Sequence, residues 1–232
     1  MDQFNTATRS AFASSEDTAN DILWVTYRWM SLGLAITGIV AMLVANTPAA
    51  VEMLVTNRVL FFGLMIAQLG LVVAFSALVT RVSTTTAAAM FFGYAALTGL
   101  TFSTLFLAFT AASIASTFFI TAGTFAGLSV YGAVTKRDLS AVGRFALFAL
   151  IGLIIASVVN IFLASSSLMW LTTFAGIVIF AALTAYDTQQ LKAMFRAEGY
   201  GSNLALRGAL KLYLDFVNMF LFLLNLTGDR RR

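Results

Sequence analysis

Two aspartates stand inside long apolar runs of this chain. Asp187 lies in 185-AYDTQQLK-192, and Asp215 lies in 211-KLYLDFVNMFLFLLNL-226. An ionised carboxylate at the centre of a bilayer costs about 2.5–3.5 kcal/mol on insertion scales, so each residue needs a partner that compensates its charge. The remaining acidic residues fit tails, loops or helix ends: Asp2, Glu16, Asp17, Asp21, Glu52, Asp138, Glu198 and Asp229.

The positions of these two aspartates predict a pair. Asp187 precedes Lys192 by five residues, which corresponds to about 7–8 Å along a helix. Asp215 follows Lys211 by four residues, and only a short loop separates the two apolar runs. We therefore expect both carboxylates at a similar depth and in contact. Like-charge repulsion and partial desolvation favour retention of one proton by such a pair near neutral pH, and its titration belongs to the pair.

Polar residues lie about one helical turn from each aspartate, where side chains share a helix face. They are Thr184, Gln190, Lys211 and Asn218. Lipid does not tolerate such polar faces, so we expect them to point toward protein or water.

A purely structural interpretation of the same residues remains open. Asp215 could form an ion pair with Lys211 within its own helix, and Asp187 could extend toward the membrane interface near Lys192. Ionisable residues inside membrane helices are nevertheless functional candidates by default.

The composition identifies the environment of these residues as a membrane. Of the 232 residues, 60% are hydrophobic and 10% are charged, and the mean hydropathy is +0.90. Soluble domains carry roughly 25% charged residues. The chain has no cysteine and no histidine, so disulfides, thiol chemistry and histidine-based pH switches are excluded. Proton-linked behaviour must then come from carboxylates.

Seven segments have the length and apolarity of membrane-spanning helices, which need about 20 apolar residues. They are residues 24–46, 59–80, 87–110, 114–134, 144–163, 168–191 and 204–226. In the fourth, 123-GTFAG-127 has the small-xxx-small spacing typical of close helix packing. The sequence thus predicts an all-α integral membrane protein with one membrane domain over 22–228. Residues 1–21 lack signal-peptide features and are expected to form an unstructured or peripheral polar tail, and 229–232 form a basic tail.

The distribution of Lys and Arg predicts the orientation. With seven spans, Arg58, Arg230, Arg231 and Arg232 fall on one side and the other ten basic residues on the opposite side. The positive-inside rule then places the N-terminus in the cytoplasm. The tail 229-DRRR-232 is discordant, and a re-entrant last segment is the alternative to seven full spans.

Motifs for common enzyme chemistry are absent from the sequence. There is no Walker loop, no GxSxG, no HExxH and no cluster of metal-ligand residues. Intramembrane aspartyl proteases of the presenilin type also use two aspartates. Although 186-YD-187 is present, Asp215 lacks the glycines of the GxGD pattern. We therefore expect no enzyme. The net charge of +4 reflects basic loops and indicates no nucleic-acid partner.

Five segments carry a resemblance to a known family. They are 27-YRWMSLGLAITG-38, 97-LTGLTFS-103, 135-TKRDLS-140, 185-AYDTQQLK-192 and 212-LYLDFVNMFLFLL-224. Over residues 22–228 the chain resembles the Bax inhibitor-1 family, also called the transmembrane Bax-inhibitor-motif family, and in particular its bacterial branch. The resemblance implies a multi-pass protein of the bacterial cell (inner) membrane, in which six helices surround a central seventh.

The resemblance also implies a function: a pH-sensitive calcium leak controlled by the aspartate pair Asp187 and Asp215. In this interpretation the pair provides candidate Ca²⁺ ligands, because Ca²⁺ prefers carboxylate oxygens. Arg81, at the end of the second span, occupies the position of a latch that holds the pair in the closed state. No organic cofactor is expected; the partners are lipid, Ca²⁺ and protons.

Two other functions remain open. Some similar bacterial proteins modulate a membrane-anchored ATP-dependent protease, and the polar tail 1–21 could be the segment that such a protease engages. A proton-coupled transporter would show paired interrupted helices, which this sequence lacks.

Overall fold

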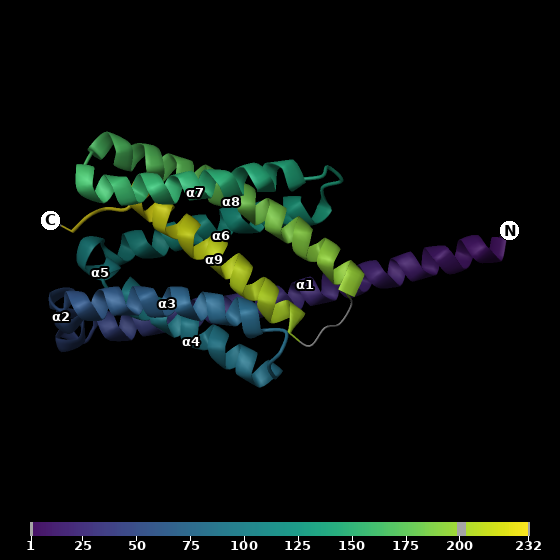
Figure 1. The fold of residues 1–232 in the computed structure, drawn as a ribbon, viewed down its shortest axis with the longest axis horizontal. Helices are drawn as coiled ribbons and strands as arrows, with labels where there is room; N and C mark the ends of the chain where they lie inside the picture. The colour runs from purple at the N-terminus through teal and green to yellow at the C-terminus, as the bar shows by residue number, and fades with distance from the viewer. Residues whose placement is uncertain (1, 199–202, 232) are drawn as a thin grey trace. The chain divides into compact units, whose positions relative to one another are not determined.

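The computed structural model describes residues 2–198 and 203–231, with residues 2–15 described by backbone alone. Its helices are α1 (Asp2–Ala45), α2 (Pro48–Thr56), α3 (Arg58–Leu78), α4 (Thr84–Phe102), α5 (Leu105–Ala108), α6 (Ala111–Val134), α7 (Ser140–Leu163), α8 (Ser166–Glu198) and α9 (Leu204–Thr227). Within the described residues the only extended pairing is an isolated antiparallel bridge between Phe109 and Arg230. Figure 1 shows the course of the chain.

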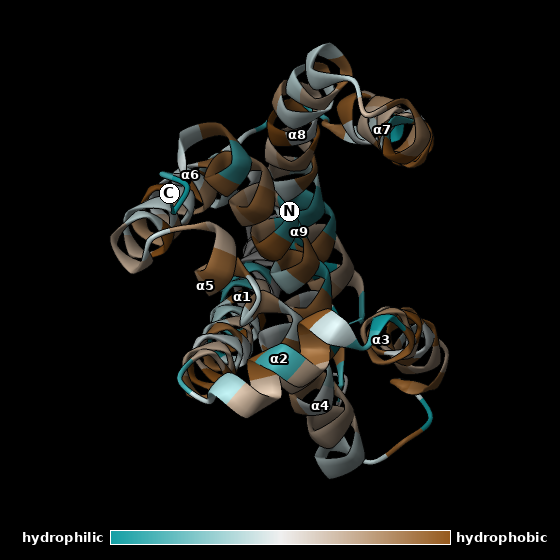
Figure 2. Cartoon of the chain, turned by 90° about the vertical axis from the view of Figure 1, so that its left-hand side faces the viewer, coloured by the Kyte–Doolittle hydropathy of each residue, from teal (hydrophilic) through white to brown (hydrophobic). Residues whose placement is uncertain are grey.

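Seven stretches of these helices are long and apolar enough to cross a membrane, which confirms the predicted fold class. They are Glu16–Ala45, Arg58–Leu78, Thr84–Ala108, Ala111–Val134, Ser140–Leu163, Ser166–Glu198 and Leu204–Thr227. In the apolar 18-residue stretch of each helix, only 6% of the residues of α3 and 11% of those of α7 are buried. Both helices are coloured mostly hydrophobic in Figure 2. Exposed apolar surface of this extent is suited to lipid. The placement of the last helix at the centre of the other six stays a prediction.

Two segments differ from the sequence-based expectation. Residues 2–21, expected to be an unstructured tail, continue α1, because neither glycine nor proline occurs before Gly33. Residues 48–56, expected to be a loop, form α2. Pro48 stands in its first turn, where proline is tolerated because the missing N–H would have no helical partner.

Side-chain caps explain where several spans begin. Asn57 accepts a hydrogen bond from the backbone N–H of Leu60 at the start of α3. Ser83 does the same for Thr86 at α4, and Thr110 caps α6. Such caps satisfy backbone donors that the first helical turn leaves unpaired.

The chain forms two compact units. One comprises residues 1–104 and 190–210, and the other comprises residues 105–189 and 211–232, so α8 and α9 contribute to both. In the first unit α1 and α3 pack beside α4 (Figure 1). The Thr37 hydroxyl donates to the Ala95 carbonyl at 2.9 Å, and a Cβ added at Gly99 would lie 2.7 Å from the Thr37 carbonyl. Small residues thus allow α1 and α4 to approach closely.

The second unit contains the hairpin of α7 and α8, which run side by side in Figure 1. Ala164 ends α7 in the left-handed conformation at φ 47°, and the Asn160 side chain accepts a hydrogen bond from the Ser165 N–H. In the same unit α8 packs on α9 where the rings of Phe180 and Phe222 stack 6.0 Å apart. This packing positions the two predicted aspartates.

Candidate functional site: a buried carboxyl pair

The structure brings Asp187 and Asp215 together. Asp187 lies on α8 and Asp215 on α9, with exposed fractions of 4% and 5%. Their carboxyl groups are close enough to interact directly. Two acidic groups at such close range can hydrogen-bond to each other only when one of them carries a proton. The structure therefore places the two aspartates together, whereas their depth in a membrane stays a prediction.

Lys211 is the cation of this site. Its Nζ lies 2.9 Å from Oδ1 of Asp187, and its charge also acts on Asp215. The ammonium lies 5.6 Å from the centroid of the Tyr186 ring, within the range of a cation–π contact. The ion pair thus joins α9 to α8, whereas the structural interpretation placed it inside α9 between Lys211 and Asp215.

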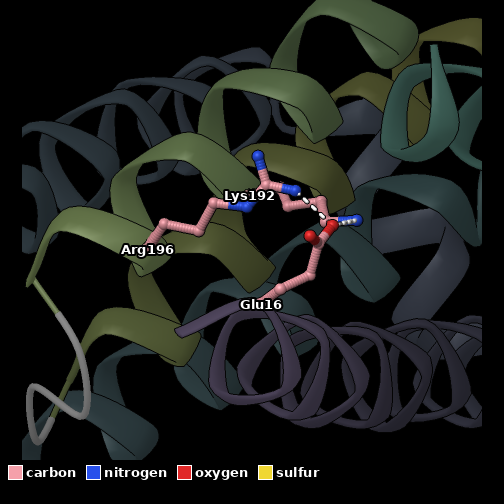
Figure 3. A network of polar contacts seen from close by, with 3 residues as sticks. All are labelled: Glu16, Lys192 and Arg196. Atoms are coloured by element: carbon pink, nitrogen blue, oxygen red, sulfur yellow. Dashed lines mark hydrogen bonds and ion pairs between the residues drawn. The ribbon is translucent and has the colours of Figure 1, made fainter. Parts of the chain in front are cut away.

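Lys192, the other cation considered for Asp187, pairs with a different carboxylate. Its Nζ lies 3.4 Å from Oε1 of Glu16, which also accepts a hydrogen bond from Arg196. Figure 3 shows the side chains of Lys192 and Arg196 on α8 converging on Glu16 of α1. The Glu16 side chain is 54% exposed, so water screens this network and we assign it little stability.

The charges of the carboxyl pair do not balance when both carboxyls are ionised. Two carboxylates then face one ammonium, and Oδ2 of Asp215 is buried without a hydrogen-bond partner among the described residues. An unsatisfied buried oxygen is costly. One proton held between Asp187 and Asp215 would supply the missing hydrogen bond and leave the group with Lys211 neutral. The arrangement is thus able to bind and release a proton.

Two glycines let neighbouring helices approach α8 closely beside Asp187. A Cβ added at Gly132 of α6 would overlap the carbonyl oxygen of Ala185, and one added at Gly143 of α7 would overlap the Tyr186 ring. In contrast, a Cβ at Gly123 or Gly127 would meet nothing within 4 Å. The predicted packing face at 123–127 is therefore wrong.

The loop that carries the 135-TKRDLS-140 segment is tied to α8 by Gln189. Its Oε1 accepts from the Leu139 N–H at 2.9 Å, and its Nε2 donates to the Arg137 carbonyl at 2.8 Å. Hydrogen bonds from Ser140 to Asp138 hold the pKa of this exposed carboxyl below its usual range. Gln189 was not among the predicted site residues, because side-chain spacing singled out its neighbour Gln190, which is exposed.

The other predicted polar residues are bonded to their own helices. The Thr184 hydroxyl donates to the Phe180 carbonyl at 2.7 Å, and the Asn218 amide donates to the Leu214 carbonyl at 2.8 Å. These bonds satisfy polar groups without using the aspartates. A direct supporting role of these two residues stays a prediction.

Arg81 is exposed in the turn between α3 and α4. Asn203, at the start of α9, fixes this turn: its Nδ2 donates to the carbonyls of Val79 and Val82 at 2.6 and 2.8 Å. Arg81 belongs to the first unit, and the carboxyl pair belongs to the second. The latch role of Arg81 stays a prediction.

Replacement of Asn203 by alanine should destabilise the turn that carries Arg81. Asn203 is 6% exposed, and the loss of its amide leaves two backbone carbonyls without their donor, at a cost of about 1–3 kcal/mol. We expect a lower unfolding midpoint in detergent. Asn225→Ala is the control, because the exposed Asn225 amide bonds only within α9, to Leu221. Equal midpoints for the two variants would contradict the assignment.

The donor set of the pair does not resemble a resident metal centre. Within residues 2–198 and 203–231, no group of three or more His, Cys, Asp or Glu side chains could hold a metal ion. Resident Ca²⁺ sites supply many oxygen ligands, whereas this site offers two carboxyls with the Lys211 ammonium beside them. Ca²⁺ coordination by Asp187 and Asp215 stays a prediction.

Comparisons with known proteins agree with the resemblance. A family model described as "Inhibitor of apoptosis-promoting Bax1" matches residues 19–232. The inner membrane protein YbhL of Escherichia coli K12 is 50% identical over 210 residues, which cover 88% of this chain and 90% of that protein. A protein of Deinococcus radiodurans is 48% identical over 88% of this chain and 89% of its own length. A protein of Borreliella burgdorferi is 41% identical, covering 91% and 93%.

Proposed function

The chain belongs to the Bax inhibitor-1 family, and from this premise we propose that it is a pH-sensitive calcium leak channel governed by Asp187 and Asp215. One observation supports the proposal: two interacting carboxyls, each about 95% buried, lie beside the ammonium of Lys211, which forms an ion pair with Asp187. A buried group of this kind changes its net charge with each proton that it binds.

Proton binding changes the contacts between α8 and α9. With one proton on the pair, the two carboxyls and Lys211 are neutral together. Loss of that proton leaves an uncompensated negative charge in the membrane interior, which favours a cation or a rearrangement of the helices. Gain of a second proton removes the anionic partner of Lys211. Either change shifts the relative free energies of two conformations, which is what a gate requires.

In this proposal Arg81 stabilises the closed state by interaction with the ionised pair. The guanidinium of the exposed Arg81 is not needed to hold the turn, because the Asn203 side chain donates the hydrogen bonds to the turn's backbone carbonyls. Arg81→Ala is then expected to raise the resting leak.

The proposal is tested by the flux of Ca²⁺ from liposomes that contain the full chain and a calcium dye, measured over a range of pH. Asp187→Asn and Asp215→Asn each remove one titrating group, so we expect most of the pH dependence to disappear. Glu198→Gln is the control, since Glu198 is an exposed carboxyl at the end of the same helix as Asp187. Wild-type flux with wild-type pH dependence in both asparagine variants would refute the proposal.

A further inference from the structure

Helix α6 presents a buried row of hydroxyl side chains to the interior of its unit. Ser113, Thr117, Thr121 and Ser129 recur at four-residue spacing, with Phe125 in the remaining position, and all five are at most 6% exposed. Residues four apart lie on one helix face. We call this set the α6 hydroxyl row.

The α6 hydroxyl row faces α9. The hydroxyls of Thr117 and Thr227 lie 3.2 Å apart, and the rings of Phe125 and Phe216 have centroids 5.5 Å apart. Phe216 directly follows Asp215. The row therefore extends along α9 from the neighbourhood of the carboxyl pair to the far end of that helix.

Most hydroxyls of the row have partners, and one does not. Thr121 donates to the Thr117 carbonyl at 2.8 Å, and Ser113 accepts from the backbone N–H of Asp229 at 2.8 Å. Ser129 is 5% exposed, and its Oγ has no hydrogen-bond partner among the described residues. A buried hydroxyl without a partner in a membrane helix is costly unless water or a ligand satisfies it.

Ser129 lies near the carboxyl-pair end of the row. Gly132, three residues further along α6, is the residue that touches Ala185 on α8, two positions before Asp187. Two further buried polar atoms of this unit without a partner in the described part of the chain lie beside the carboxyl pair: Oδ2 of Asp215 and Oγ1 of Thr188, the residue after Asp187. Three unsatisfied oxygens, on α6, α8 and α9, thus lie toward the carboxyl-pair end of the α6 hydroxyl row.

Aromatic rings fill the interface next to this end, in the middle of α9. Besides contacting Phe125, Phe216 lies 5.4 Å from Phe118, which lies 6.4 Å from Phe220. Apolar constrictions of this kind block water and ions in channels until the rings separate. Along α6, Thr121 lies between Phe118 and Phe125, and beyond the rings the row continues with Thr117 and Ser113.

We propose that the α6–α9 interface is the route of permeation, in which the α6 hydroxyl row replaces part of the water around a hydrated cation and the Phe118, Phe125, Phe216 and Phe220 rings form the gate. This inference rests on the proposed channel function and assigns the path that the cation takes through the channel. Hydroxyl oxygens are hard ligands, which suit a partly hydrated divalent cation.

A pocket lies at the far end of α9, on the side of this helix that faces the start of α8. It has a volume of about 340 Å³ and is lined by Met169, Trp170, Thr173, Asn225, Leu226, Gly228 and Arg230. Its lining flanks Thr227, the residue whose hydroxyl contacts Thr117. One end of the row thus lies near the carboxyl pair, and the other end contacts Thr227, whose neighbours in sequence line the pocket.

The absence of cysteine from the sequence permits a direct test of water access. Single cysteines are placed at Thr121 and Ser129 in the full chain, in a Phe125→Ala background that opens the gate, and treated in liposomes with a small, charged methanethiosulfonate. Only hydrated thiols ionise and react. Val130→Cys in the same background is the control, because Val130 is 62% exposed on the apolar outer surface of α6.

We expect Thr121→Cys and Ser129→Cys to react many-fold faster than Val130→Cys. We also expect Phe125→Ala to raise Ca²⁺ flux several-fold, while Phe119→Ala, whose ring is 73% exposed on the same helix, leaves flux unchanged. Thiols at 121 and 129 that react no faster than the thiol at 130 would show that the row is only a packing face, and would overturn the route. Labelling uses neither Ca²⁺ nor the aspartates, so this failure is distinct from failure of the proposed function, which the Asp→Asn variants report.

Discussion

Gly132→Ala is expected to lower the unfolding midpoint of this protein markedly, although it adds one methyl group. The new Cβ would overlap the Ala185 carbonyl oxygen, and a helix backbone cannot move aside as a flexible side chain can. Overpacking of this kind costs about 1–3 kcal/mol. Because Asp187 lies two residues beyond Ala185, separation of α6 from α8 should also displace the carboxyl pair and alter the pH dependence of flux.

Gly127→Ala is the matched control on the same helix. A Cβ at Gly127 meets nothing within 4 Å, so the substitution should leave stability unchanged or raise it, by up to about 1 kcal/mol through helix propensity. The two variants are compared by thermal unfolding in detergent and by flux in liposomes. If Gly132→Ala unfolds at the same temperature as Gly127→Ala, the close approach of α6 and α8 is not as described.

The membrane spans were predictable because each is a long apolar run, and hydropathy depends on composition more than on packing. The predicted span 59–80 corresponds to Arg58–Leu78, and 114–134 corresponds to Ala111–Val134. Helix α2 was missed because its nine residues are too few for a span, and because Asn46 and Thr47 followed by Pro48 indicate a turn. The helical course of residues 2–21 was missed because their polarity argued against packing and many of them are Asp, Asn, Ser or Thr, which have low helix propensity.

The carboxyl pair was predictable for a different reason. Depth along a helix follows from residue counting, so Asp187 and Asp215 could be placed at one level without knowing how the helices pack. The partner of Lys211 could not be chosen this way, because a lysine can reach either along its own helix or across to a neighbour, and the choice depends on the rotation of α8 against α9. Packing glycines pose the same problem: Gly127 and Gly132 differ only in the helix face that they occupy.

The conformation of the C-terminal tail also could not be predicted from the sequence. Residues 229-DRRR-232 were treated as a basic tail whose charge conflicts with the positive-inside rule. In the structure the Thr110 N–H donates to the Asp229 carbonyl at 3.1 Å, and the Arg231 N–H donates to the Ala108 carbonyl at 3.0 Å. These bonds fasten the tail to the α5–α6 connection through backbone atoms, which carry no sequence signal.

Lys211→Met should convert the carboxyl pair into an uncompensated buried charge. Breaking a fully buried ion pair costs about 3–5 kcal/mol; the Lys211 side chain is 40% exposed, so we expect a loss nearer about 1.5–3 kcal/mol. The loss should be largest at high pH, where both carboxyls are ionised, and should shrink as the pH falls, because protonation removes the uncompensated charge.

The double variant Lys211→Met with Asp187→Asn separates this charge effect from lost packing. Asparagine keeps the shape of Asp187 and removes its charge, so only one carboxyl remains in the site, and the site is neutral while that carboxyl holds its proton. We expect the double variant to be more stable at high pH than Lys211→Met alone and to lose stability less steeply as the pH rises, because one carboxyl instead of two must ionise without the cation. Strict additivity of the two single substitutions would show that Lys211 and Asp187 are not coupled. That result would remove the charge balance on which the proposed gate depends, whereas strong coupling would show that one lysine and one proton together keep two carboxyls inside the membrane.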